Sequence, residues 1–247
     1  MFPFDGVGRR ERSNVRARFD LLPTELRTLG ISKTLENLPV INEKQQDGIV
    51  FYPVAKRLFD VTFVLLCAPF LLPLFAMVAA LIKLDSPGPV FFRHERLGKN
   101  GKPFKMLKFR TMVIDAEERK KSLMELNEYS GGDFKIAKDP RVTRIGRHLR
   151  ALSLDELPQL IHVITGKMSL VGPRATSIPL EYYQPEELER LTVLPGIAGP
   201  AQLLARGQEF SSRCKYDIWY VRNRSFMMDL RLLLLVVLVF LTVPNGQ

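Results

Sequence analysis

An uncharged, strongly apolar run of residues is the feature that most constrains the fold of this chain. Residues 61–82 contain no charged side chain, and the run is long enough to cross a bilayer once. Pro69 and Pro73 fall in its middle, where proline removes a backbone hydrogen bond and kinks or breaks a helix. Burial of such a segment in a soluble core is disfavoured by its length, so the run indicates a membrane-associated protein.

Cationic residues flank the apolar run on both sides. They are Lys56 and Arg57 before it, and Lys83, Arg93 and Arg96 after it. Because cations beside a membrane segment favour the cytoplasmic side, both ends of the run are expected on the same face. A helix that enters the membrane, breaks at the prolines and returns satisfies both observations, and a proline-kinked spanning helix is the alternative. We predict a re-entrant membrane helix at about residues 56–84.

Composition narrows the class of protein and the partners it binds. The chain has 247 residues, 46% of them hydrophobic, which is enough for one sizeable domain with an arm. Its net charge of +10 indicates an anionic partner, such as nucleic acid, anionic lipid or a phosphate-rich substrate. Cys67 and Cys214 provide neither a disulfide framework nor zinc-ligand spacing, which fits a reducing compartment. We predict an N-terminal arm at residues 1–50, too charged for a signal peptide, and a domain at residues 51–247.

A basic β-hairpin is predicted directly after the apolar run. Residues 90–93 and 104–110 have strand character, and Gly98, Asn100 and Gly101 provide the turn between them. Beside a membrane segment, its cations are expected to face lipid headgroups or a phosphorylated substrate, with nucleic acid as the alternative. These cations are Arg93, Arg96, Lys99, Lys102, Lys105, Lys108 and Arg110.

Amphipathic helices are predicted to complete an α+β fold that is mostly α. Residues 116–126 have a helical pattern, ended by Gly131 and Gly132. Asp139 and Pro140 are predicted as the N-cap and first residue of a basic amphipathic helix of the kind that lies on membranes. A short helix at 185–191 and an apolar helix at 226–243 follow. We expect the apolar helix to pack in the membrane interface or on the first apolar run. The apolar face of the basic helix consists of Val142, Ile145, Leu149 and Leu152.

Two adjacent carboxylates, Asp155 and Glu156, stand between cations and are the strongest candidates for chemistry. Pro158 is tolerated in a first helical turn, and Ser153 and Glu156 have the spacing of a capping box. A helix is therefore predicted to start near Ser153 or Asp155 and to stop near Gly166. The helix dipole would favour ionised carboxylates, which can act as a nucleophile or bind a metal. Simple helix capping is the alternative interpretation.

Together these segments resemble the bacterial sugar transferases known as monotopic phosphoglycosyl transferases. The resemblance runs from about residue 56 to residue 241 and rests on several motifs in one order, which makes it specific. The motifs are KRLFD at 56–60, SPGPVFFR at 86–93, KPFKMLKFRTM at 102–112, DPRVTRIGRHLR at 139–150, SLDELPQL at 153–160, GKMSLVGPR at 166–174 and PGIAGPAQ at 195–202. The spacing of Asp217, Tyr220, Asn223, Ser225 and Asp229 adds to it.

The resemblance implies an activity and a set of site residues. The substrates would be a UDP-sugar and undecaprenyl phosphate, with Mg²⁺ as cofactor. Asp155 would attack the sugar-side phosphorus and release UMP, and the covalent sugar phosphate would then pass to the lipid. Glu156 would assist at the metal, which both carboxylates would bind, or in proton handling. Phosphates would be held by Arg150 and Arg174 with help from Lys108 and Arg110, and the nucleotide would be bound at Pro173 and Gln202.

The resemblance also implies a location. The catalytic domain would lie on the cytoplasmic face of the bacterial inner membrane, in contact with anionic phospholipid and with no nucleic acid partner. The reaction would be the first membrane step of exopolysaccharide, capsule, O-antigen or glycoprotein glycan assembly. The oligomeric state stays open, a homodimer included. The sugar also stays open.

Four positions depart from the family pattern, and one alternative function remains. Ala68, Ala175, Leu194 and Ala198 replace a serine, a proline, an arginine and a threonine, which affects contacts to the nucleotide or the sugar. The alternative is a catalytically idle membrane scaffold that recruits other glycan-assembly enzymes. Retention of both Asp155 and Glu156 weighs against a scaffold.

Overall fold

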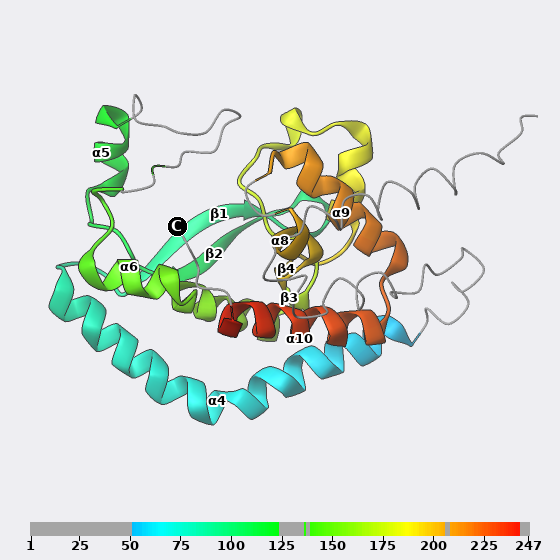
Figure 1. Ribbon diagram of the computed structural model, residues 1–247, viewed down its shortest axis with the longest axis horizontal. Helices are drawn as coiled ribbons and strands as arrows, with labels where there is room; N and C mark the ends of the chain where they lie inside the picture. The colour runs from blue at the N-terminus through cyan, green and yellow to red at the C-terminus, as the bar shows by residue number, and fades with distance from the viewer. Residues whose placement is uncertain (1–50, 124–135, 137–138, 206–207, 243–247) are drawn as a thin grey trace, which may run out of the picture.

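The computed structural model describes residues 51–123, 136, 139–205 and 208–242. The predicted N-terminal arm and the glycine break at Gly131 and Gly132 lie outside these residues. One long helix, α4, curves beneath a mixed body of short helices and two small two-stranded sheets (Figure 1). The fold is therefore mostly helical with little sheet, as predicted.

Helix α4 spans Tyr52–Asp85 and contains both prolines of the apolar run. A straight helix of this length would measure about 51 Å, well beyond the ~30 Å core of a bilayer. Instead α4 is bowed, with its two ends turned up against the rest of the chain and its middle farthest away (Figure 1). Because proline removes a backbone donor and crowds the preceding turn, Pro69 and Pro73 account for the bend.

The outward surface of α4 is apolar and uncovered. Its length and composition would allow it to cross a membrane. Only 11% of its most apolar 18-residue stretch is buried inside the protein. Leu66 is 70% exposed and Phe70, next to the bend, is 80% exposed. A helix with this exposure is not the core helix of a water-soluble domain.

Each half of α4 packs into a different hydrophobic cluster of the body. In the N-terminal half, Val64 joins a cluster that includes Met168 and Tyr220. In the C-terminal half, Val78 and Ile82 pack with residues of the hairpin and of the basic helix at residues 144–151. Since both halves are held by one body, the bend is fixed by packing as well as by proline.

The predicted hairpin is confirmed. Strands β1 (Phe91–Leu97) and β2 (Pro103–Phe109) pair antiparallel, joined by a short 3₁₀ turn at Lys99–Gly101. Asn100 and Gly101 take positive φ values of 57° and 70°, which these residue types tolerate in tight turns. The first strand ends four residues later than predicted, at Leu97, because all of its residues pair with β2.

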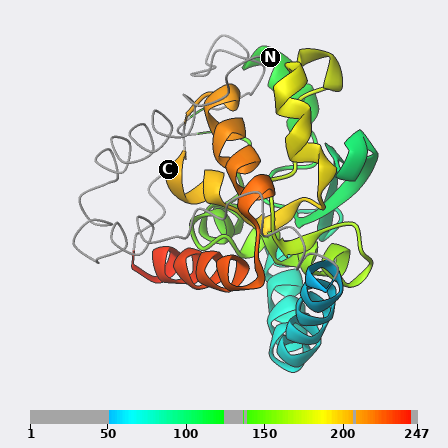
Figure 2. The same cartoon turned by 90° about the vertical axis from the view of Figure 1, so that its right-hand side faces the viewer.

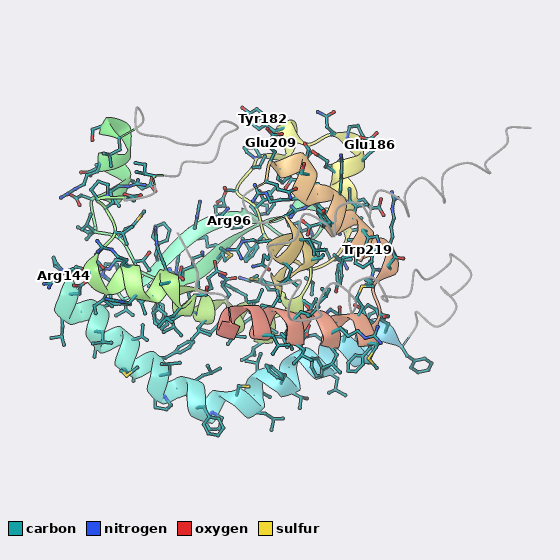
Figure 3. The ribbon with its side chains drawn as sticks, in the orientation of Figure 1. Arg96, Arg144, Tyr182, Glu186, Glu209 and Trp219 are labelled. Carbon is teal, nitrogen blue, oxygen red and sulfur yellow. The ribbon has the colours of Figure 1, made fainter. Side chains whose placement is uncertain are left out.

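Two helices follow the hairpin, and one of the predicted starts is wrong. Helix α5 spans Ala116–Ser122, within the predicted 116–126. Helix α6 spans Arg144–Ala151 and begins after Thr143, whose side chain accepts a hydrogen bond from the Gly146 amide. Asp139 does not cap a helix, because its carboxylate is bound to the Arg141 guanidinium instead. In Figure 3, Arg144 lies at the start of α6, above the C-terminal end of α4.

The predicted apolar face of the basic helix is only partly buried. Leu149 is buried in the cluster beneath it, and Ile145 packs against that cluster. Leu152 is 66% exposed because it follows the last residue of α6, where the helix has already ended. The helix therefore buries its apolar side chains and exposes its basic ones, and the exposed Leu152 lies just beyond it.

The rest of the body consists of short elements and two longer helices. A parallel pair of strands, which was not predicted, brings residues 169–171 beside residues 196–198. Helix α10 (Phe226–Thr242) packs on α4, as predicted for its contact with the apolar run, and contributes Met228 and Leu232 to the cluster that contains Val64. The elements are η4 (Leu154–Gln159), α7 (Leu160–Ile164), β3 (Ser169–Val171), η5 (Leu180–Tyr182), η6 (Pro185–Thr192), β4 (Gly196–Ala198), α8 (Pro200–Leu204), α9 (Phe210–Asn223) and α10 (Phe226–Thr242).

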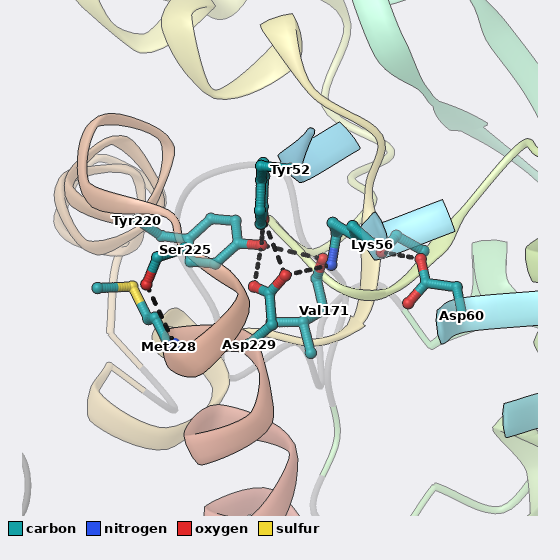
Figure 4. Close-up of polar contacts among 9 residues, drawn as sticks. Tyr52, Lys56, Asp60, Val171, Tyr220, Ser225, Met228 and Asp229 are labelled. Atoms are coloured by element: carbon teal, nitrogen blue, oxygen red, sulfur yellow. Dashed lines mark hydrogen bonds and ion pairs between the residues drawn. The ribbon is translucent and has the colours of Figure 1, made fainter. Parts of the chain in front are cut away.

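A buried polar network joins the start of α4 to α9 and α10 (Figure 4). Asp229 accepts hydrogen bonds from the Tyr52 hydroxyl at 2.8 Å and from Lys56 Nζ at 2.7 Å. The Tyr220 hydroxyl lies 2.6 Å from the other Asp229 oxygen and 3.2 Å from the Val171 carbonyl oxygen. The hydroxyls of Tyr52 and Tyr220 and both oxygens of Asp229 are paired, which offsets their desolvation and fixes the entry angle of α4.

We expect Asp229→Ala to destabilise the fold strongly. The change leaves Lys56 without its carboxylate in a largely buried site, and losing one partner of such a pair costs about 3–5 kcal/mol. Glu189→Ala, which breaks the exposed pair with Arg222, should cost about 0–1 kcal/mol and serves as the control. Thermal unfolding of the detergent-purified proteins measures both, and equal shifts would contradict a structural role for the network.

Candidate functional site

The carboxylate pair lies on η4, a 3₁₀ turn of six residues that leads directly into α7. The predicted capping box is not formed, since Ser153 takes φ 54° and its side chain makes no cap hydrogen bond. The left-handed residue turns the chain sharply after α6, so Asp155 and Glu156 face the hairpin. The predicted stop at Gly166 is close to the observed end of α7 at Ile164, and Gly166 has φ 75°.

Glu156 is held between two cations from different elements. Lys108 Nζ of β2 lies 2.8 Å from one carboxylate oxygen of Glu156. The Arg174 guanidinium, from the segment after β3, donates to both oxygens of the same carboxylate. Burial alone would raise the pKa of Glu156, but Arg174 and Lys108 together hold that pKa well below its usual range. Glu156 is therefore a fixed anion at this site.

Asp155 is in a different environment from its neighbour. Its side chain is 11% exposed, and its nearest described cation is Lys108, with Nζ 3.8 Å from Oδ2. Burial raises the pKa of Asp155, an effect that Lys108 offsets only in part and that the negative charge of Glu156 adds to. This is the opposite of the effect that the helix-dipole argument predicted, because η4 is short and the desolvation cost is larger.

Arg150 approaches the pair from α6. Its Nε donates to the Thr111 hydroxyl at 2.9 Å, and its charge lowers the pKa of Asp155. The contact depends on close packing of α6 on the backbone at Thr111, where a Cβ on Gly146 would lie 2.1 Å from the carbonyl oxygen. Glycine at 146 thus allows α6 to bring Arg150 beside the carboxylates.

The parallel strands β3 and β4 bring the remaining predicted site segments together. Pro173 and Arg174 follow the carboxyl end of β3, and Gln202 follows that of β4, so the two segments leave the same edge of the sheet. The Gly196 amide donates to the Pro173 carbonyl at 2.9 Å and locks the two segments together. The Gln202 side-chain oxygen is buried without a hydrogen-bond partner among the described atoms.

Arg110 is placed apart from the other predicted phosphate ligands. It is 6% exposed, and its guanidinium donates to the backbone carbonyls of Ser86 and Pro87 just after α4. The structure therefore gives Arg110 a contact that holds the end of α4 to β2. Its predicted contact with phosphate remains a prediction.

A buried ion pair behind Arg174 was not singled out by the sequence. Arg190 of η6 donates to Asp217 of α9, and both side chains are almost fully buried. Arg190 also donates to the backbone carbonyl of Arg174 at 2.6 Å. Asp217 is part of the family spacing noted above, but no sequence signal linked Arg190 to it.

The carboxylate oxygens of Asp155 and Glu156 are the candidate ligands for Mg²⁺ at this site. This ion binds through one or two carboxylates and completes its shell with water and substrate phosphates. Asp155 fits that pattern, since its carboxylate has only a long contact with Lys108. Ligation by Glu156 would compete with Lys108 and Arg174 for its oxygens. Among the described residues, no three His, Cys, Asp or Glu side chains gather as a metal site.

Comparison with known proteins shows similarity over most of the chain. The family model described as bacterial sugar transferase matches residues 51–243. The exopolysaccharide production protein ExoY of Rhizobium meliloti (strain 1021) is 40% identical over 197 residues, which cover 77% of this chain and 84% of that protein. The exopolysaccharide production protein PSS of Rhizobium leguminosarum bv. phaseoli is 40% identical over 210 residues, covering 78% and 98%.

A larger relative is named for a defined reaction. The UDP-glucose:undecaprenyl-phosphate glucose-1-phosphate transferase of Escherichia coli (strain K12) is 37% identical over 201 residues. The match covers 77% of this chain but 40% of that protein. The similarity to it is therefore confined to part of the longer protein.

Replacing Glu156 should alter stability in a pH-dependent way. Because its folded-state pKa lies below the unfolded value of about 4.3, its ion pairs stabilise fully above that pH and lose this effect as the pH falls. Glu156→Gln should lower the free energy of unfolding at pH 7 by about 1–3 kcal/mol. The difference from wild type should shrink below about pH 4. Thermal unfolding across pH measures it.

The exposed Glu186 offers a matched control for this experiment. Glu186→Gln removes one negative charge from the surface of η6 and should change stability little at any pH. A Glu156→Gln effect of the same size at pH 3 and pH 7 would contradict the ion-pair account.

Proposed function

Because the chain belongs to the bacterial sugar transferase family, we propose that it transfers a sugar 1-phosphate from a UDP-sugar to undecaprenyl phosphate and releases UMP. The observation that carries the proposal is that the two neighbouring carboxylates have different contacts with cations. Glu156 is bound by two cations, whereas Asp155 has only a long contact to Lys108. The site therefore contains one fixed anion and one carboxylate available to attack.

The reaction would proceed in two displacements at phosphorus. An Asp155 oxygen attacks the sugar-side phosphorus of the UDP-sugar, forms a bond to it and breaks the bond from that phosphorus to the bridging oxygen. UMP leaves with that oxygen. An oxygen of undecaprenyl phosphate then attacks the same phosphorus and releases the Asp155 carboxylate, which leaves a sugar on a polyprenyl diphosphate. A covalent intermediate lets one site use a water-soluble donor and a lipid acceptor in turn.

Cations of the chain would offset the charge of the reacting diphosphate. Arg174 and Lys108 converge on Glu156, and Arg150 is close enough for its charge to act on Asp155, so a bound diphosphate would meet three cations. Mg²⁺, when bound, would neutralise diphosphate charge, with Asp155 as its carboxylate ligand. Burial raises the pKa of Asp155, and a cation bound beside it would lower that pKa and favour the ionised nucleophile.

The position of the site relative to α4 supports a membrane substrate. Leu154 and Leu157, on the same turn as the carboxylates, pack against the cluster formed by Val78 and Ile82 of α4. The reactive turn therefore packs on the same hydrophobic cluster as the C-terminal half of the proposed membrane helix. A lipid phosphate at the membrane surface would reach Asp155 while its isoprenoid tail stays among the acyl chains.

The bend in α4 supports the re-entrant arrangement over a kinked span. Both ends of the helix pack on one body, and α10 runs crosswise at the level where α4 leaves that body (Figure 2). Helix α10 also carries exposed apolar side chains, among them Met227 and Leu234. We infer that α4 dips into the cytoplasmic leaflet of the bacterial inner membrane and returns, with α10 in the interface.

Release of UMP without the lipid acceptor tests the reaction. Wild-type enzyme mixed with Mg²⁺ and a panel of UDP-hexoses should release UMP in a burst of about one equivalent when undecaprenyl phosphate is omitted. Asp155→Asn should abolish the burst, since an amide cannot replace the carboxylate nucleophile. UMP release that requires the acceptor would indicate direct transfer instead. No release with any donor or acceptor would favour the membrane scaffold.

Labelling in intact cells tests the membrane topology. Single cysteines at Phe51 and Lys99, in a background lacking Cys67 and Cys214, should be equally protected from an impermeant thiol reagent added outside. Both should react once the cells are opened. A cysteine at Phe70, near the bend, should stay unreactive in both conditions because it would lie in the membrane, and it serves as the control. Labelling of one end alone in intact cells would establish a spanning helix.

A further inference from the structure

Arg190 makes an unusual set of contacts for a residue outside the carboxylate site. Its Nε and Nη2 lie 3.0 and 2.7 Å from Asp217 Oδ2, and its Nη1 lies 3.2 Å from the Tyr183 hydroxyl. Nη2 also lies 2.6 Å from the backbone carbonyl oxygen of Arg174. The Phe210 ring covers the guanidinium at 5.5 Å. Arg190 therefore joins η6, α9 and the segment that carries Arg174.

We propose that Arg190 is a positioning residue for phosphate binding and acts through Arg174. By holding the Arg174 carbonyl, it fixes the backbone from which the Arg174 guanidinium reaches Glu156 and, in the complex, the diphosphate. The inference rests on the proposed function, because the consequence of a misplaced Arg174 is weaker binding of a diphosphate donor. It extends the site to a residue that does not touch the substrate.

A buried ion pair such as that of Arg190 and Asp217 is weak evidence for a role in stability alone. Burying two charges costs desolvation energy, and apolar residues of similar volume often stabilise a core as well. Oδ1 of Asp217 is also buried without a hydrogen-bond partner in the described part of the chain. The ion pair is costly to bury, and its Arg190 also holds the backbone carbonyl of Arg174. These two facts fit a positioning role better than a packing role.

The geometry requires the planar fork of arginine. Three acceptors lie around the guanidinium on different sides, namely Asp217, Tyr183 and the Arg174 carbonyl. A lysine ammonium at position 190 would keep the charge opposite Asp217 but could not reach all three acceptors from one point. Arg190→Lys therefore keeps the positive charge and removes the guanidinium fork, so it tests the two properties separately.

A double-mutant cycle distinguishes positioning from general weakening of the fold. The single variants Arg190→Lys and Arg174→Ala and the double variant are assayed for kcat/KM of UMP release with the best UDP-hexose. Arg190→Lys alone should lower kcat/KM by about 10- to 100-fold, as expected for a displaced substrate-binding group. In the Arg174→Ala background the same change should lower it by less than about threefold, because the group it positions is gone.

The pair of Arg222 and Glu189 provides the matched control. It also joins α9 to η6, but at the surface, where Arg222 is 61% and Glu189 31% exposed. Arg222→Lys should leave kcat/KM within about twofold of wild type. If Arg190→Lys does not fold, Asp217→Asn replaces it in the cycle, since this change keeps an acceptor for Arg190 but removes the charge.

The outcomes separate this inference from the proposed function. Coupling between positions 190 and 174, with Arg222→Lys near wild type, supports positioning. Equal losses in both backgrounds, or a loss at Arg222→Lys as large as that at Arg190→Lys, would overturn it while the wild-type turnover upheld the transferase activity. Absence of wild-type turnover would overturn the proposed function and the inference with it.

Discussion

Two cations, Lys108 and Arg174, share the carboxylate of Glu156, and the arrangement of the site depends on this contact. Lys108 comes from the hairpin and Arg174 from the segment after β3, so the contact ties these two parts of the body to η4. It also gives the adjacent carboxylates different charge environments. The negative charge of Glu156 is balanced by its two partners, whereas burial works against the charge of Asp155 until a further cation is present.

The second constraint is the bend in α4. Pro69 and Pro73 break the regular hydrogen bonding of the helix, and the body holds both halves through separate clusters. The polar network at Asp229 fixes the first half, and the Arg110 contact with the backbone after α4 fixes the other end. Because Leu154 and Leu157 pack on the same cluster as the second half, the bend and the reactive turn are parts of one packed unit.

Sequence patterns predicted the features that depend on local chemistry. The apolar run, the hairpin turn at Asn100 and Gly101 and the importance of the carboxylate pair follow from residue types and spacing. Helix starts were less predictable, because competing contacts decide them. Asp139 has the chemistry of an N-cap but pairs with Arg141, and Thr143 caps the helix instead.

Features that depend on contacts distant in sequence could not be predicted. The parallel pairing of residues 169–171 with residues 196–198 has no local signal in two segments of three residues. The link from Arg190 to Asp217 and the Arg174 carbonyl joins positions 27 and 16 residues apart. The direction of the Asp155 pKa shift could not be predicted either. Spacing indicated a helix dipole that would lower this pKa, but not the burial that raises it.

The two neighbouring carboxylates have different roles in the proposed reaction, in which Asp155 alone forms a bond to phosphorus. Peptide mass spectrometry of the enzyme quenched after reaction with a UDP-hexose and Mg²⁺, without lipid acceptor, tests this difference most directly. A mass gain of one hexose phosphate mapped to Asp155, and retained there in a Glu156→Gln variant, is the predicted result. A modification mapped to Glu156, or an unmodified protein after UMP has been released, would contradict the account.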